Sequence, residues 1–397
     1  MERISEVFTA VADGARRAAW LGLAARGPVN RVVLPSGHPA WMVTGNAEAR
    51  AALTDSRLSR GRAGVAFRRE LPEAAMLQTH MLNQNPPDHT RLRKLITAAF
   101  TRRRVESLAP RIEAISAELI DGLTPALGRG GAVDLAAEYA FPLPFRVICA
   151  LLGIPWRNED QLSIWFTTLA AGTTAGLDAY REAADNMLGF LRDTITAKRD
   201  DPGDDLISGL IQVRDGTDRL SENELMAMVY LLFIAGHETT ASLITNSVLA
   251  LLRHPGQLTL LRERPLLIDS AVEETLRYDG VVQATMPALA IETFPLGGQL
   301  IEAGDVVAVS PMAVGMDPDV TAEPDRFDIT RNAPHLAFGH GIHYCIGAPL
   351  ARLEARIGLR QLLDLFPGLE LADDTVERLP SVMFNRIAAL RVRLPRR

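Results

Sequence analysis

The residues best suited to chemistry lie in the segment 338–347, which holds one of the chain's two cysteines, Cys345. Three glycines surround this cysteine: Gly339, Gly341 and Gly347. Glycine lets the backbone approach a flat ligand without a Cβ in the way. The residues after 347 predict a helix with Pro349 in its first turn. A cysteine just before a helix N-terminus is favoured as a thiolate, which is what a metal centre with one sulfur ligand needs.

Three interpretations of Cys345 compete. The first is a buried structural cysteine in a turn, which is common in intracellular proteins. The second is a zinc site made of His340, His343 and Cys345, but structural zinc needs four closed ligands and usually paired cysteines. The third is a haem iron with one axial thiolate, which needs a single cysteine. The third interpretation also accounts for the glycines, so we favour it.

The pattern Phe-Gly-x-Gly-x-His-x-Cys-x-Gly, from Phe338 to Gly347, resembles the haem-binding loop of the cytochrome P450 superfamily. The resemblance implies that Cys345 is the axial ligand of a haem b iron. It implies further that Phe338, Gly339 and Gly347 lie against the haem and that His343 contacts a haem propionate.

A second candidate site is the stretch that follows Asn85-Pro86-Pro87, where these residues predict the start of a helix. His89 and Arg93 are four residues apart and share one helix face. An imidazole beside a guanidinium suits a carboxylate or a phosphate, although such a pair alone is more often a solvated surface. In the resembled family the Pro-Pro-x-His-x-x-x-Arg helix binds haem propionates, which assigns that role to His89 and Arg93.

A long helix is predicted from Ser221, which forms a capping box with Glu224, to about Arg253. Its centre carries Ala235-Gly236-His237-Glu238-Thr239. A glycine in a helix interior costs about 1 kcal/mol relative to alanine, and an acid is costly to bury. Residues placed against stability in this way indicate a functional site.

The small side chains of Ala235 and Gly236 leave room for a diatomic ligand. Thr239 is expected to bond the carbonyl of Ala235, four residues back, and to open the helix locally. Glu238 is a candidate proton relay. The structural alternative is a helix crossing made of small residues with a surface glutamate. The resemblance to the family's oxygen-activation motif implies that Ala235 and Gly236 contact the cofactor and that Glu238 and Thr239 are catalytic.

A helix predicted from Leu266 to Tyr278 carries Glu274 and Arg277, a spacing that is commonplace on helix surfaces. The family packs such a pair against an arginine of a Pro-x-Arg-Phe segment, which implies a structural triad with Arg326. The chain also departs from the family. It has no Lys, Arg or His between Arg277 and Arg326, where many bacterial members carry an arginine that binds a propionate.

The substrate pocket is expected to be apolar, and a medium or large lipophilic molecule is therefore expected as the substrate. Its candidate residues come from the irregular stretch 56–84, the long helix, a predicted strand at 281–285 and a predicted turn at 381–385. They are Phe67, Met76, Met81, Leu232, Phe233, Val282, Met383 and Phe384.

Composition limits the class of protein. The chain has 397 residues, 47% of them apolar, and no evident linker or repeat, so one domain covering residues 1–397 is expected. A net charge of −6 argues against general nucleic-acid binding. The apolar run Leu225–Gly236 is too short to cross a bilayer, and the charged N-terminus lacks a signal-peptide core. A cytoplasmic protein without a membrane anchor is expected.

The resemblance covers most of the chain and implies a mainly helical fold with a small β-rich subregion, the P450 prism with its long central helix. It implies a monooxygenase that inserts one oxygen atom from O₂ into a C–H or C=C bond, with electrons from NAD(P)H through a ferredoxin. A natural-product scaffold is the expected substrate. Two alternatives remain open, a haem-thiolate gas sensor and a peroxide-driven peroxygenase. Basic residues expected on the cysteine side of the haem would attract an acidic ferredoxin: Arg91, Lys94, Arg102, Arg103, Arg104, Arg352 and Arg356.

Overall fold

The computed structural model describes residues 6–12, 14–63, 75–155, 159–171, 176–213 and 218–395. Phe67, a predicted pocket residue, lies outside these ranges. The chain forms two compact units that are both discontinuous in sequence. Unit 1 comprises residues 1–58, 109–143 and 239–397, and unit 2 comprises residues 59–108 and 144–238. A single domain over the whole length stays a prediction.

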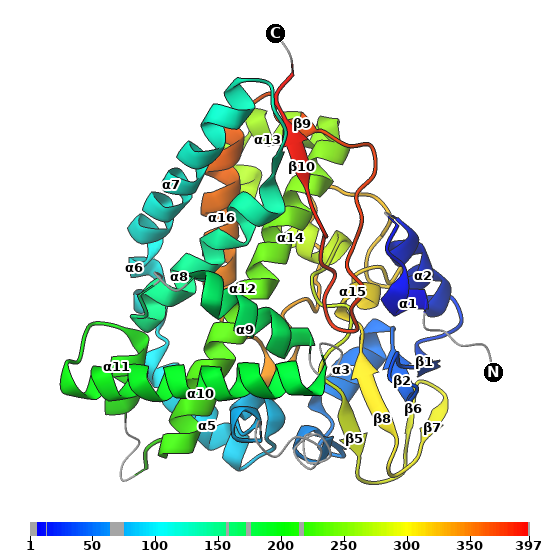
Figure 1. The fold of residues 1–397 in the computed structure, drawn as a ribbon. Helices are drawn as coiled ribbons and strands as arrows, with labels where there is room; N and C mark the ends of the chain where they lie inside the picture. Colours follow the sequence, from blue (N-terminus) through cyan, green and yellow to red (C-terminus); the bar gives the residue numbers. More distant parts are fainter. Residues whose placement is uncertain are drawn as a thin grey trace. The chain divides into compact units, whose positions relative to one another are not determined.

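The main sheet belongs to unit 1 and is built on the predicted N-terminal hairpin. Strands β1 (Val29–Val33) and β2 (Pro39–Val43) pair antiparallel in register. Strand β2 also pairs in parallel with β8 (Val306–Val309), which pairs antiparallel with β5 (Ala288–Ala290). Strand β3 (Leu58–Ser59) follows β5 at the edge of this sheet. Figure 1 labels β1, β2, β8 and β5 of the sheet. The hairpin is therefore confirmed, and it is completed by strands from far along the chain.

Two smaller β-structures complete unit 1. Strands β6 (Phe294–Leu296) and β7 (Gln299–Ile301) form a two-stranded hairpin. Strand β10 (Arg391–Arg393) lies between β4 (Val133–Asp134) and β9 (Glu370–Leu371).

Residues 281–285, predicted as a strand, are not one. Only Val282 forms an isolated bridge, with Phe384. The backbone N–H of Gln283 bonds Met383, whereas that of Thr285 bonds Val309. Because the segment divides its hydrogen bonds between two partners, no continuous ladder forms.

The helices of unit 1 include a layer in which α16 packs against both α7 and α14. The helices described in unit 1 are α1 (Glu6–Thr9), α2 (Ala15–Ala24), α3 (Asn46–Thr54), α7 (Ala109–Gly128), α13 (Pro255–Glu263), α14 (Ile268–Tyr278), α15 (Pro311–Val314) and α16 (Ala348–Leu365). A π-helical turn spans Ala136–Ala140.

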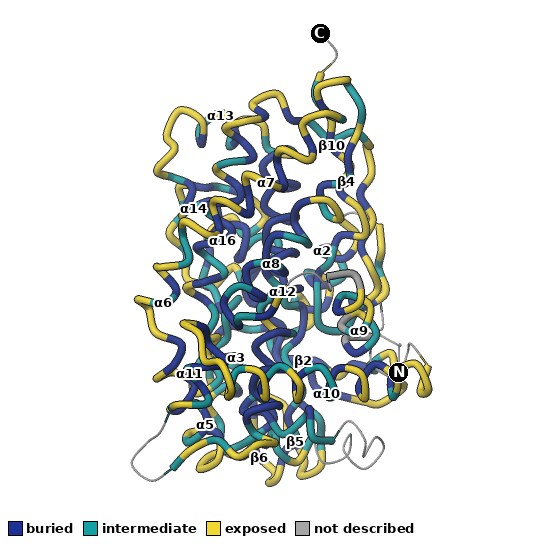
Figure 2. Tube along the Cα trace, turned by 60° about the vertical axis from the view of Figure 1, so that its left-hand side comes forward, coloured by how far each residue is buried: buried dark blue, intermediate teal, exposed yellow. Residues whose placement is uncertain are grey.

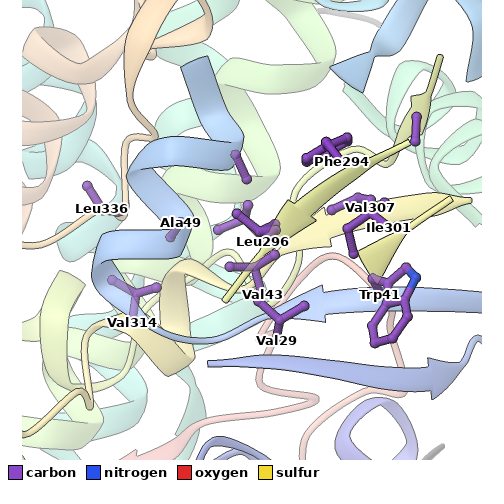
Figure 3. Close-up of a cluster of buried hydrophobic side chains, with 13 residues drawn as sticks. Val29, Trp41, Val43, Ala49, Phe294, Leu296, Ile301, Val307, Val314 and Leu336 are labelled. Atoms are coloured by element: carbon purple, nitrogen blue, oxygen red, sulfur yellow. The ribbon is translucent and has the colours of Figure 1, made fainter. Parts of the chain in front are cut away.

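A hydrophobic cluster of unit 1 joins the main sheet, the β6–β7 hairpin and α3 (Figure 3). It contains Val43, Phe294 and Val307, and also Leu336, which lies two residues before Phe338. The carbonyl of Leu336 accepts a hydrogen bond of 2.8 Å from the N–H of Gly339. The start of the cysteine loop is thus anchored in the core of its own unit.

Unit 2 is helical in its described part. Its helices are α5 (Asp88–Ala99), α6 (Arg102–Ser107), α9 (Glu159–Ala171), α10 (Leu177–Asp200) and α11 (Leu206–Gln212), with 3-10 turns at Met76–Gln78 and Met81–Asn83. Helix α10 packs against α9 and α11, and α11 packs against α5. Helix α8 (Pro142–Leu152) begins in unit 1 and continues into unit 2.

The long helix α12 (Glu222–Arg253) has the predicted bounds. Its capping box is formed, because the N–H of Ser221 bonds the Glu224 carboxylate at 2.8 Å and the N–H of Glu224 bonds Ser221 Oγ at 3.3 Å. Among the helices described, α12 is the one long and apolar enough to cross a membrane, and 78% of its apolar stretch is buried in the protein. Figure 2 shows most of this helix as buried. It is a core helix.

Candidate active site

The cysteine loop has the local structure that its sequence predicts. A 3-10 turn covers Gly341–His343, and α16 begins at Ala348 with Pro349 in its first turn. The N–H of Cys345 donates to the carbonyl of Phe338 at 2.9 Å, which closes the loop. Cys345 is exposed, so its sulfur is accessible to a ligand.

Two of the three glycines adopt a left-handed backbone, with φ of 77° at Gly339 and 70° at Gly341. A Cβ on Gly341 would come within 2.9 Å of Thr54 Cγ2 and 3.1 Å of the Leu53 carbonyl, so the loop can approach α3 only with glycine here. Gly347 has an ordinary φ of −81°. A Cβ there would lie 3.8 Å from Cys345 Sγ, in van der Waals contact with the sulfur.

The donor set fits a cofactor held by one sulfur. Within the described ranges, no group of three or more His, Cys, Asp or Glu side chains is arranged to hold a metal ion, so His340, His343 and Cys345 do not form a zinc cluster. One accessible thiol before a helix N-terminus matches an axial thiolate of haem iron. Cys149, by contrast, is fully buried in the core, as predicted.

In unit 2, His89 and Arg93 lie on α5, and His89 is buried. The helix starts at Asp88, and Asn85 does not cap it with its side chain. Instead Asn85 Oδ1 accepts from the N–H of Arg60 at 3.2 Å and Asn85 Nδ2 donates to Ser59 Oγ at 2.6 Å. Asn85 thus ties the segment around Arg60 to the start of α5.

Arg60 is a basic residue that the sequence analysis missed. Burial lowers the pKa of His89, and the positive charges of Arg93 and Arg60 lower it further. Burial also lowers the pKa of Arg60, to about 10. Unit 2 therefore gathers three basic groups at a cost in electrostatic energy, which an anionic ligand would relieve. The sequence has no Lys, Arg or His from residue 278 to 325, where many members of the resembled family carry an arginine that binds a propionate. That absence was the sequence signal that a basic residue elsewhere in the chain could take this role.

The central residues of α12 differ in exposure. Ala235 is exposed although its helix neighbours Leu232 and Phe233 are buried, and Thr239 is half-buried. Glu238 is only 5% exposed, so its carboxylate is held inside the protein. The hydrogen bond predicted between Thr239 and the Ala235 carbonyl stays a prediction.

Gly236 also has a packing role within unit 2. A Cβ on Gly236 would lie 3.2 Å from Ile148 Cδ1 of α8, closer than ordinary van der Waals contact. This contact supports the structural interpretation of Gly236, a close helix crossing. The functional interpretation stays a prediction.

The Glu274–Arg277 pair is buried at 1% exposure of each side chain, and it is bidentate with two bonds of 2.7 Å. Arg277 also donates to the carbonyls of Gly315, Pro324 and Arg326. The backbone N–H of Asp328 donates to Glu274 at 2.9 Å. The pair thus binds the segment that precedes the cysteine loop to α14, a structural role.

The prediction that the Arg326 side chain completes this triad is wrong. Its guanidinium is 57% exposed and pairs with Glu323 and Asp328, and only its backbone carbonyl reaches Arg277. The guanidinium near Glu274 is that of Arg331, at 3.5 Å and 15% exposure. The chain turns between residues 326 and 331, so the later arginine points inward.

The predicted pocket residues of unit 1 come together in the structure. Val282 bridges Phe384, and both are half-buried together with Met383. The buried Gln283 side chain donates to the carbonyls of Ser381 at 3.0 Å and Phe384 at 2.8 Å. This amide therefore fixes the predicted turn at 381–385 beside Val282.

A second polar group secures the same turn. Asn385 Nδ2 donates to Asp279 Oδ1 at 2.7 Å, and Arg378 bonds both Asp279 Oδ2 at 2.6 Å and Asn385 Oδ1 at 2.9 Å. Asn246 of α12 donates to the carbonyl of Asp279 at 2.9 Å. These buried groups satisfy one another, as buried polar groups must.

Two of the predicted pocket residues described in unit 2, Phe233 and Met81, contact other core residues. Phe233 packs edge-on against Phe145, with ring centroids 5.7 Å apart, and Leu232 is buried. The backbone N–H of Met81 lies 3.4 Å from the sulfur of Met228, and Met76 is half-buried. Their assignment to a substrate pocket stays a prediction.

Comparisons with known proteins identify the family. The model of the family described as cytochrome P450 matches residues 160–381. The chain is 46% identical over 362 residues to the vitamin D(3) 25-hydroxylase of Pseudonocardia autotrophica, covering 89% of this chain and 87% of that protein. It is 40% identical over 348 residues to the mycinamicin IV hydroxylase/epoxidase of Micromonospora griseorubida, covering 87% and 86%.

Solved structures agree on the fold. The tirandamycin C-bound P450 monooxygenase TamI superposes with a TM-score of 0.86 at 40% identity, covering 95% of this chain and 97% of that one. The predicted fold class, mainly helical with a small β subregion, is confirmed. P450 enzymes use haem iron and dioxygen, and the relatives are named as hydroxylases, epoxidases and monooxygenases. The chain therefore belongs to the cytochrome P450 superfamily and is one of its monooxygenases.

Proposed function

We propose that the protein inserts one atom of dioxygen into a C–H or C=C bond of a lipophilic natural product, by hydroxylation or epoxidation. The observation that carries this proposal is the accessible Cys345, on a glycine loop that opens directly into α16. The names of the relatives support a small organic molecule as the substrate, because they refer to vitamin D(3), mycinamicin IV and tirandamycin C.

Haem b would be held by the cysteine loop, by residues of α12 and by the basic residues of unit 2. Cys345 would supply the thiolate ligand, and the bound cofactor would supply the chemistry of O–O cleavage, which a thiolate ligand favours. The propionates would be bound by Arg60, His89 and Arg93, with His343 as a further donor. Phe338, Gly339 and Gly347 of the loop, and Ala235 and Gly236 of α12, would lie against the ring. Arg60 would thereby replace the base that is missing from 278–325.

Glu238 and Thr239 would deliver protons. Adjacent residues of a helix point about 100° apart, so the two side chains cannot face the same point. We assign the ligand-facing position to the half-buried Thr239, whose hydroxyl would hold a proton-donating water. The carboxylate of Glu238, held inside the protein, would pass protons toward that water.

Electrons would come from NAD(P)H through a ferredoxin-type donor in the cytoplasm. The basic residues expected to attract an acidic donor differ in their pairing. Arg352 and Arg356 pair with carboxylates of α14, and Arg91 pairs with Asp218 and Glu224. Arg103 is exposed. We therefore assign more of the steering to Arg103 than to Arg91, because a paired charge has a weaker long-range field.

The test is the absorption spectrum of the reduced protein with carbon monoxide. Thiolate ligation gives a strongly red-shifted Soret band, which Cys345→Ser should lose together with most activity. The matched control is Cys149→Ser, which removes the buried core sulfur and should leave the band in place. A band that survives in Cys345→Ser overturns the proposal. Turnover supported by peroxide but not by NAD(P)H with a ferredoxin would indicate a peroxygenase, and binding of gas without turnover would indicate a sensor.

A further inference from the structure

The carboxylate of Glu273, on α14, joins three parts of unit 1. Arg352, in the first half of α16, donates to it twice, with Nε to Oε1 at 2.6 Å and Nη2 to Oε2 at 2.8 Å. His335, which precedes the cysteine loop, has its Nε2 3.1 Å from Glu273 Oε2. Burial raises the pKa of Glu273, but the bonds from Arg352 and His335 outweigh this effect and hold the pKa at about 2.

The hydrogen bonds assign the tautomer of His335. The N–H of Ala337 donates to His335 Nδ1 at 3.2 Å, so Nδ1 is the acceptor nitrogen. The proton of the neutral ring is then on Nε2, where it is donated to Glu273. The imidazole therefore connects the carboxylate to the backbone of the residue next to Phe338.

The other side of this network reaches Phe338 itself. The Arg352 guanidinium lies over the Phe338 ring, with Cζ 4.3 Å from the ring centroid, which is a cation–π contact. The carbonyl of Phe338 in turn accepts the hydrogen bond of 2.9 Å from the N–H of Cys345. A chain of direct contacts thus runs from Glu273 through Arg352 and Phe338 to the backbone of the cysteine.

One turn away, the same two helices carry a matched ion pair without these contacts. Asp269 of α14 lies 3.5 Å from Arg356 of α16, and both side chains are exposed. This pair links α14 to α16, as Glu273 and Arg352 do, but neither residue is in contact with an aromatic ring of the cysteine loop among the ring contacts described. A comparison of the two pairs therefore distinguishes the effect of linking α14 to α16 from the effect of positioning the cysteine loop.

We propose that Glu273 is a positioning residue that holds Phe338, through Arg352 and His335, and thereby keeps the Cys345 backbone in the geometry for thiolate ligation. This inference rests on the proposed haem-thiolate function. A bidentate Arg–carboxylate bond is strong and directional, so it fixes the guanidinium over the ring instead of leaving it to rotate in solvent. The same pairing also takes Arg352 out of the set of charges available to an electron donor.

The test compares Glu273→Gln with Asp269→Asn in the haem-loaded protein. The rate at which the reduced carbon monoxide complex loses its red-shifted band in mild urea is measured beside the urea midpoint from circular dichroism. Glu273→Gln should lose the band roughly threefold to tenfold faster than wild type, as expected for about 0.7–1.4 kcal/mol of lost positioning. Asp269→Asn should leave the rate unchanged. Glu273→Asp, which keeps the charge, should recover part of the effect.

Two further measurements keep the inference falsifiable. Removing the carboxylate leaves the Arg352 charge uncompensated near the loop, so Glu273→Gln should raise the reduction potential of the haem, and Asp269→Asn should not. Hydrogen exchange of peptides that cover 338–345 should be faster in Glu273→Gln. Equal band-loss rates, potentials and exchange in the two variants overturn the inference. A wild-type protein without the red-shifted band overturns the proposed function instead, and exchange of the loop then decides the positioning role.

Discussion

The structure places Arg331, and not Arg326, beside the buried Glu274–Arg277 pair. From this arrangement we derive a quantitative prediction. In Arg331→Ala the protein loses the 3.5 Å ion pair to Glu274 and the bonds from Arg331 to the carbonyls of Ala322 at 2.5 Å and Glu323 at 3.2 Å. Each such bond contributes about 1 kcal/mol net, so the free energy of unfolding should fall by about 2–3 kcal/mol. Glu274 keeps both bonds to Arg277, and the loss should therefore stay below the ~3–5 kcal/mol expected when a buried charge is left unpaired.

The matched control is Arg326→Ala. Its side chain is 57% exposed and its ion pairs are 3.3 and 3.4 Å long, so the loss should be at most about 0.5 kcal/mol. With an unfolding entropy of about 2.1 cal/mol/K for each of 397 residues, 2–3 kcal/mol lowers the melting temperature by about 3 °C. Urea and thermal unfolding of the two haem-loaded variants, followed by circular dichroism, measure the difference. A loss in Arg326→Ala equal to that in Arg331→Ala would refute the reasoning.

Three other predictions address the reaction, the cofactor and the pocket. Thr239→Ala should keep NAD(P)H consumption while product falls and hydrogen peroxide rises, whereas Glu238→Gln should lower consumption and product together, by roughly a hundredfold; an unchanged product-to-NAD(P)H ratio in Thr239→Ala contradicts the assignment. Arg60→Ala should lose haem to an acceptor protein about tenfold faster, because a charge-assisted bond to a propionate is lost; a wild-type rate would exclude Arg60 as a haem ligand. Asn385→Ala should lower the free energy of unfolding by about 2 kcal/mol, because Asp279 loses a hydrogen-bond donor. It should also change the ratio of oxidation products from a substrate with several reactive positions. An unchanged ratio would mean that the turn does not contact the substrate.

Features encoded by neighbouring residues were predictable from the sequence. The capping box of Ser221 and Glu224 and the helix it opens both follow from spacings of a few residues, and both are confirmed. The cysteine loop belongs to the same class, because glycine is the residue favoured at the positive φ values of positions 339 and 341. Local rules decide such elements, and tertiary packing agrees with them.

Features that depend on distant partners were not predictable in the same way. Val281–Thr285 has the composition of a strand, but its hydrogen bonds are divided between Met383 and Val309. Arg326 and Arg331 are equally plausible partners of Glu274 by residue type, and only the course of the turn between them decides which points inward. Nothing in the residues around Arg60 marks it as a neighbour of His89, because that proximity depends on a side-chain bond made by Asn85.

The discontinuity of unit 1 has a consequence for how the protein is made. A chain leaves the ribosome from its N-terminus, and domains tend to fold as their residues emerge. All of unit 2 has been synthesised by residue 238, when β2 still lacks its neighbour β8. Until Val306–Val309 arrives, the apolar edge of β2, with Met42 and Val43, stays open to wrong pairing, as any uncovered strand edge does. Nascent chains of this protein are therefore expected to need a chaperone until translation has passed β8, and the proposed binding of haem at Cys345 would follow that step.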